Sequence, residues 1–122
     1  MIEPLIIDLT WPAKELSPNA RVHFMVKHRF AKAAKIEAGW ATKIVRPIRW
    51  ASDGPFTVQV TAHPPKNWST GDNDNFVARL KSHFDGIAEV LGVNDSTFET
   101  PTVSWADKTE RGKVIVRIAE VA

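Results

Sequence analysis

Apolar residues recur in this sequence with two different spacings, and segments of the two kinds alternate along the chain. In residues 54–65 every second residue is apolar, which is the pattern of a strand with one buried face. In residues 17–45 apolar residues recur every three or four positions, which is the pattern of an amphipathic helix. A chain that switches between these patterns is expected to pack helices against a sheet.

The same reasoning assigns the other segments. Residues 4–11 are a short, β-branched run that Pro12 ends, and residues 76–91 are helical, with Asp74 or Asn75 as cap and Gly92 as stop. Residues 98–105 and 113–121 are predicted to be strands that a short polar segment joins as a hairpin. We therefore predict one α+β domain over residues 1–122, a four-stranded mixed sheet with two helices packed on it in the order β-α-β-α-β-β.

The first helix is expected to begin at Ser17, as N-cap, with Pro18 in its first turn, and to end before Pro47. Six of its apolar residues share one face, which we expect to be buried: Val22, Val26, Ala33, Ile36, Trp40 and Ile44. Six basic residues share a flank beside that face: Arg21, His28, Lys32, Lys35, Lys43 and Arg46. A basic stripe of this kind can follow a phosphate backbone or can simply be a solvated helix face.

Charge is distributed unevenly, although the chain of 122 residues carries a net charge of only +2. Residues 17–50 hold eight basic residues and one acid, so this part carries +7 and the remainder −5. Such asymmetry predicts a basic surface for a polyanion and an acidic patch elsewhere. The absence of cysteine, of a signal-peptide pattern and of an apolar run near 18 residues leads us to expect a soluble cytoplasmic protein without membrane association.

Two aspartates, Asp72 and Asp74, stand close together in the stretch GDNDNF just before the second helix. One reading is capping and turn formation, which accounts for only one of them. An EF-hand loop fails, because its sixth position would be Val77 instead of glycine and its twelfth His83 instead of glutamate. The third reading is a divalent-metal site, since alternate residues of an extended segment point to the same side.

Three downstream residues extend this pattern. Lys81 follows Asp74 by about two helical turns and Asp85 follows Lys81 by one, so all three lie on one stripe. Lys81 and Asp85 either form a simple ion pair or place a lysine near a metal and a phosphate. Asp95, in the turn after the helix, is either a turn former or a third metal ligand. Trp68, before the acidic stretch, can stack on a base or pack on the sheet, and packing is favoured.

Taken together, DNDN followed by LKSHFDGIAEVLGVND resembles the RusA family of Holliday junction resolvases, in the form found in phages and prophages. The family pattern is D-x-D-N, a helix with K-x-x-x-D and an aspartate in the next turn. The segments LTWP, LSPNARVH and the strand leading to HPP also look similar, so the likeness covers nearly the whole chain.

The resemblance implies a RusA-like fold and a Mg²⁺-dependent endonuclease, with Mn²⁺ as a possible substitute, that acts as a homodimer and nicks four-way DNA junctions symmetrically. It implies that Asp72, Asp74 and Asp95 hold the metal and that Lys81 is catalytic. DNA contacts are then expected from six basic residues: Arg21, Lys32, Lys35, Lys43, Arg46 and Lys66.

This chain departs from the best-known member of that family in two places. Its lysine follows the second aspartate by seven residues instead of four, and Asn94 stands where that member has an aspartate. Two alternatives stay open at this point. One is a DNA-binding protein of the same fold with weak or no catalysis, and the other is a nuclease for flaps or other branched DNA.

Overall fold

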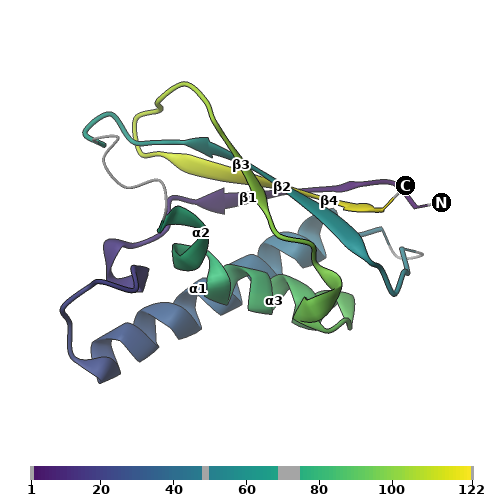
Figure 1. Ribbon diagram of the computed structural model, residues 1–122, viewed down its shortest axis with the longest axis horizontal. Coiled ribbons are helices and arrows are strands. Elements are labelled where there is room, and N and C mark those ends of the chain that lie inside the picture. Colours follow the sequence, from purple (N-terminus) through teal and green to yellow (C-terminus); the bar gives the residue numbers. More distant parts are fainter. Residues whose placement is uncertain (1, 48–49, 69–74, 122) are drawn as a thin grey trace.

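The computed structural model describes residues 2–47, 50–68 and 75–121. These residues form an α+β fold with one four-stranded mixed sheet, as the sequence predicts. All the helices lie on one side of the sheet, and the two ends of the chain meet at one edge of the molecule (Figure 1). The elements, in chain order, are β1 (Leu5–Thr10), η1 (Lys14–Leu16), α1 (Phe24–Val45), β2 (Phe56–His63), α2 (Phe76–Arg79), α3 (Lys81–Leu91), η2 (Asp95–Thr97), β3 (Thr102–Trp105) and β4 (Lys113–Glu120).

The strand order is β1-β4-β2-β3, and this makes the predicted hairpin of the last two strands wrong. The strand β4 is antiparallel to both β1 and β2, whereas β3 pairs in parallel with β2. Burial accounts for the edge position of β3. In β4 the alternate residues Val114, Val116 and Ile118 are fully buried, whereas the short strand β3 has no buried residue and takes an edge. The two central strands, β4 and β2, both bury apolar residues at alternate positions.

The helix α1 begins at Phe24, six residues later than predicted, with His23 instead of Ser17 before it. Ser17 does not cap it, because its carbonyl closes a turn by accepting from Ala20 N at 3.0 Å. His23 is the N-cap residue, and its ring accepts from Met25 N at 3.2 Å. The second predicted helix is divided at Leu80, whose N–H bonds to the carbonyl of Val77, so the described residues form three α-helices instead of the predicted two.

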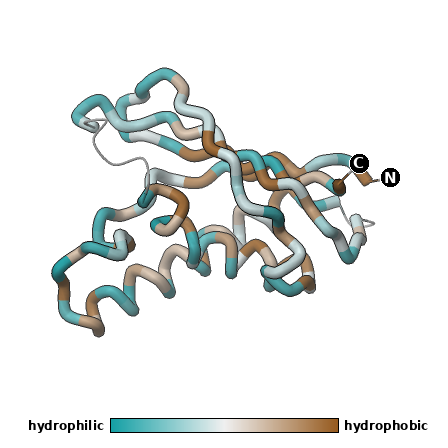
Figure 2. Tube along the Cα trace, viewed as in Figure 1, coloured by the Kyte–Doolittle hydropathy of each residue, from teal (hydrophilic) through white to brown (hydrophobic). Residues whose placement is uncertain are grey.

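The buried face of α1 is the opposite of the predicted one. Small side chains face the core, namely Ala34, Ala38 and Thr42, and the threonine hydroxyl donates to Ala38 O at 2.7 Å. Trp40 is 62% exposed, and Ile36 and Ile44 are also exposed. Hydrophobic and hydrophilic residues alternate along the length of α1 (Figure 2).

Close helix packing explains this choice. A methyl group placed on Gly86 of α3 would lie 2.2 Å from the carbonyl oxygen of Lys35 in α1. The backbones of the two helices therefore approach so closely that only small residues fit between them. Large side chains such as that of Trp40 are placed on the outer face by sterics, although their spacing alone predicts a core position.

Candidate functional site

The structure brings together three of the downstream charged residues of the predicted site. Lys81, Asp85 and Asp95 line one cavity of about 340 Å³, and Glu99 adds a further carboxylate. Apolar side chains from β2, from the helices α2 and α3 and from the segment before β3 also line it: Val58, Val77, Ala78, Phe84, Phe98 and Pro101. Asp72 and Asp74, the other two predicted ligands, lie outside the described residues.

The chain runs the whole length of α3 between Lys81 and Asp95, and both residues line this cavity. Lys81 is the first residue of α3, and Asp95 opens η2 after the end of that helix. Asn94 holds the turn, because its side chain accepts from Ser96 N at 2.9 Å. The next residues then join the sheet, where Glu99 N donates to Phe56 O at 2.9 Å. Sequence spacing alone does not show that Lys81 and Asp95 share a cavity. The segment after Asp95 is held beside the cavity by the parallel pairing of β3 with β2.

Both described ends of the acidic stretch are attached to one aromatic cluster. Trp68 precedes the stretch and packs edge-on against Trp11, with ring centroids 5.2 Å apart. Phe76 follows the stretch and lies 5.0 Å from both Trp11 and Trp105. Trp68 therefore packs, as the sequence analysis favours. The cluster connects the ends of the acidic stretch to the start of the helix pair that carries Lys81.

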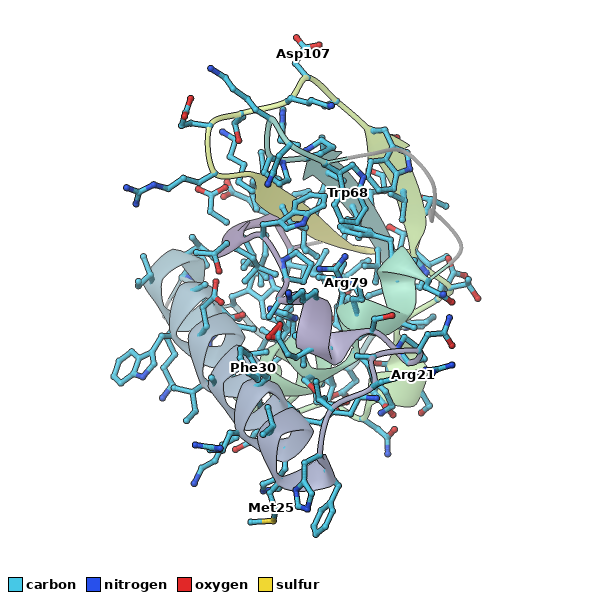
Figure 3. The ribbon with its side chains drawn as sticks, turned by 90° about the vertical axis from the view of Figure 1, so that its left-hand side faces the viewer. Arg21, Met25, Phe30, Trp68, Arg79 and Asp107 are labelled. Atoms are coloured by element: carbon cyan, nitrogen blue, oxygen red, sulfur yellow. The ribbon has the colours of Figure 1, made fainter. Side chains whose placement is uncertain are left out.

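Arg79 forms the base of this cluster and was not anticipated from the sequence. It is buried, its guanidinium donates to Pro12 O, and its central carbon lies 5.2 Å from the Trp68 ring centre. Trp68 and Arg79 lie one above the other beside α2 (Figure 3). A cation over an indole face is favourable, and more so where water is excluded. No periodicity marks Arg79 in advance, because it stands between the apolar residues Ala78 and Leu80.

Lys81 and Asp85 form the predicted ion pair, with Nζ and Oδ2 3.6 Å apart. The lysine side chain is 75% exposed, so the pair contributes only a few tenths of a kcal/mol and leaves the ammonium free to move. One turn further along α3, Glu89 pairs with Lys35 of α1 at 2.9 Å. The hydrogen bond and the charge of Lys35 lower the pKa of Glu89, and those of Glu89 raise the pKa of Lys35.

The donor chemistry of the cavity suits a hard divalent cation. Its carboxylates, Asp85, Asp95 and Glu99, are oxygen ligands of the kind that Mg²⁺ takes. Within residues 2–47, 50–68 and 75–121, however, no three carboxylate or histidine side chains form a group that could hold a metal ion. A complete site at Asp95 would therefore need Asp72 or Asp74 as well.

The six predicted DNA-binding residues separate into groups. Lys32, Lys35 and Lys43 line a groove of about 360 Å³ between α1 and α3. Arg46 instead donates to Val90 O at 2.7 Å and so holds the end of α3. Lys66 pairs with Glu110 at 2.9 Å. Arg21 precedes α1 and does not line the groove (Figure 3).

The comparisons with known proteins give one similar sequence and no activity. No family model matches the chain. An uncharacterized protein of Xylella fastidiosa (strain Temecula1) is 33% identical over 120 residues, and the match covers 94% of this chain and 76% of that protein. In the described part of the chain, no helix is long and apolar enough to cross a membrane.

Proposed function

The chain belongs to one family with the uncharacterized Xylella fastidiosa protein, and from this premise we propose that it is a Mg²⁺-dependent, structure-specific DNA endonuclease that resolves four-way junctions. The observation that carries the proposal is the cavity that joins Lys81 to Asp95 across the length of α3. Its other support is the resemblance of D-x-D-N, K-x-x-x-D and the following aspartate to the RusA pattern. The proposed substrate lies in the cytoplasm.

In this proposal the residues of the cavity divide the work of phosphodiester hydrolysis. The oxygen of a water bonds to phosphorus, one P–O ester bond breaks, and a proton goes to the leaving alkoxide. Asp95, with Asp72 and Asp74, would hold Mg²⁺, and Mn²⁺ in its place. The bound cation would supply a more acidic water and stabilise charge on the phosphate. The exposed ammonium of Lys81 is free to leave Asp85 and to neutralise a phosphate oxygen as charge builds on it.

The basic face of α1 supplies the DNA contacts in this proposal. Residues 24–45 hold five lysines or arginines and one glutamate, a net charge of +4. The acidic cavity on the other side of α3 would repel a phosphate backbone, so binding energy must come from elsewhere. Among the described residues, the three lysines of the groove are the ones that could supply this binding energy by contacting phosphates.

We propose in addition that the protein acts as a homodimer, because two symmetric nicks need two sites related by a two-fold axis. The first turns of α1 extend beyond the rest of the molecule (Figure 1). They expose Phe24, which is 70% accessible, and Met25, which is 53% accessible. We infer that these two neighbouring apolar side chains form part of the dimer contact.

A cleavage assay tests the proposal. A synthetic four-way junction, a flap and a linear duplex, each end-labelled, are incubated with the protein in Mg²⁺ or in EDTA. We expect paired nicks in the junction only, lost in EDTA and reduced about 10²- to 10³-fold in Asp95→Asn and in Lys81→Met. Asp107→Asn is the matched control, because Asp107 lies at the far tip of the molecule (Figure 3).

The other results lead to different conclusions. Cleavage of the flap alone would replace the junction with another branched substrate. Junction binding without a cut would favour a non-catalytic DNA-binding protein. Full activity of Asp95→Asn would remove the cavity from the mechanism.

A further inference from the structure

The groove between α1 and α3 combines an aromatic ring with positive charge. Lys32, Lys35 and Lys43 line it together with Ile36 and Trp40. The ammonium of Lys43 lies 4.8 Å from the centre of the Trp40 ring, and 62% of Trp40 remains exposed. An exposed indole beside lysines is the combination that holds single-stranded nucleic acid, since bases stack on the ring and phosphates contact the cations.

The charges of the groove favour a polyanion over a second copy of the chain. Glu89 also lines the groove, but it is paired with Lys35 at 2.9 Å, so it neutralises one lysine and leaves Lys32 and Lys43. A two-fold helix pair through this face would bring two α1 helices of net charge +4 together. The positive charges of two such helices would repel each other and oppose association. The same charges attract a phosphate backbone.

The groove is also connected to the candidate active site. Lys81 and Asp85 line the cavity, and Glu89, one helical turn after Asp85, lines the groove, so neighbouring turns of α3 contribute to both.

We propose that this groove binds an unpaired DNA segment adjacent to the cleavage site, with one base stacked on Trp40 and phosphates held by Lys32 and Lys43. The segment must be unpaired at that point, because a base within a duplex already has both faces covered. The inference rests on the proposed endonuclease function for the position of the cut, but the groove itself can be tested without cleavage.

The experiment measures binding of a fluorescein-labelled oligothymidylate of about twelve nucleotides by anisotropy, in EDTA, across a salt series. We expect Trp40→Leu to weaken binding about five- to 150-fold, the range for loss of one base–aromatic stack. Lys32→Gln and Lys43→Gln should each reduce the slope of log K against log salt by about 0.7. Lys113→Gln, an exposed lysine outside the groove, should leave both quantities unchanged. Thermal melts check that every variant is folded.

Several results would overturn the inference. Equal affinity of wild type and Trp40→Leu for the oligonucleotide would remove the stacking contact. Trp40-dependent binding to phosphatidylglycerol vesicles without oligonucleotide binding would make the face a lipid contact. Dissociation of a wild-type dimer by Trp40→Leu, without an effect on oligonucleotide binding, would make it a contact between copies.

The groove and the endonuclease proposal can fail separately. Junction cleavage that depends on Asp95 in a protein that binds no oligonucleotide overturns the groove and keeps the enzyme. Trp40-dependent oligonucleotide binding in a protein that cuts no junction supports the groove as a nucleic-acid site and overturns the enzyme.

Discussion

The substitution Gly86→Ala should destabilise the protein, although alanine is the better helix former. The new methyl carbon would lie 2.2 Å from the carbonyl oxygen of Lys35 and 3.0 Å from its carbonyl carbon. Non-bonded heavy atoms prefer about 3.5 Å, so α1 and α3 must separate by about 1 Å. Overpacking of this kind costs about 1–3 kcal/mol or more, and the backbone offers no rotamer to relieve it. The gain in helix propensity offsets about 1 kcal/mol.

Gly39→Ala is the matched control in the facing helix. Its methyl group would meet Val90 Cγ2 at 3.5 Å and Gly86 O at 3.8 Å, which are ordinary contacts. This variant should therefore be more stable than wild type by about 0.4–1 kcal/mol. Urea unfolding followed by circular dichroism measures both changes. The reasoning about helix contact would be refuted if Gly86→Ala were as stable as Gly39→Ala.

Three further predictions concern metal binding, pH and assembly. Saturating Mg²⁺ should raise the unfolding midpoint of wild type by more than that of Asp95→Asn, and equal shifts in a thermal melt would contradict a metal site at Asp95. Burial lowers the pKa of His83 below its ordinary 6.5 by more than Glu37 raises it, so the unfolded chain takes up the proton first as the pH falls. Stability should therefore fall as the pH drops below about 6.5, less so in His83→Gln, and urea midpoints that fall equally in both proteins would argue against this assignment. Phe24→Glu should shift the sedimenting species from dimer to monomer, whereas Ile6→Glu, on the open face of the sheet, should not.

The general architecture follows from the sequence because the spacing of apolar residues and the length of each segment are local properties of the chain. The alternation in residues 54–65 predicts β2, observed at Phe56–His63, and the run from residue 113 predicts β4, observed at Lys113–Glu120. Gly92 ends α3 in a left-handed conformation with φ of 70°, as expected for a glycine stop. One α+β layer with four mixed strands follows from these elements.

The errors come from interactions between distant segments. Turn chemistry alone favours a hairpin of residues 98–105 with 113–121, but the competition for the central position of the sheet places β2 between them. The apolar periodicity of α1 likewise identifies a real stripe and assigns it to the wrong side. The contact at Gly86 sets that orientation, and a glycine 47 residues after Gly39 carries no visible signal of it.

Part of the candidate site could be predicted. The ion pair of Lys81 with Asp85 follows from helical spacing, and the packing of Trp68 follows from its apolar surface. The position of Asp95 in the same cavity as Lys81 depends on the parallel pairing of β3 with β2. The local spacing of apolar residues does not predict that pairing. Arg79 contacts Trp68 and the carbonyl of Pro12, which come from distant parts of the chain, so its contribution emerges only in three dimensions.

The charges on the two sides of α3 separate binding from cleavage in the proposed function. The cavity has three carboxylates and one lysine, so without a cation it repels a phosphate, whereas the groove is lined by three lysines and one carboxylate. Removal of Mg²⁺ should therefore abolish cutting and leave oligonucleotide binding intact. Added salt should weaken binding first, because surface lysine–phosphate contacts are screened and release counterions. A protein in which EDTA and salt affected both activities equally would have a single site, and the division of labour across α3 would be wrong.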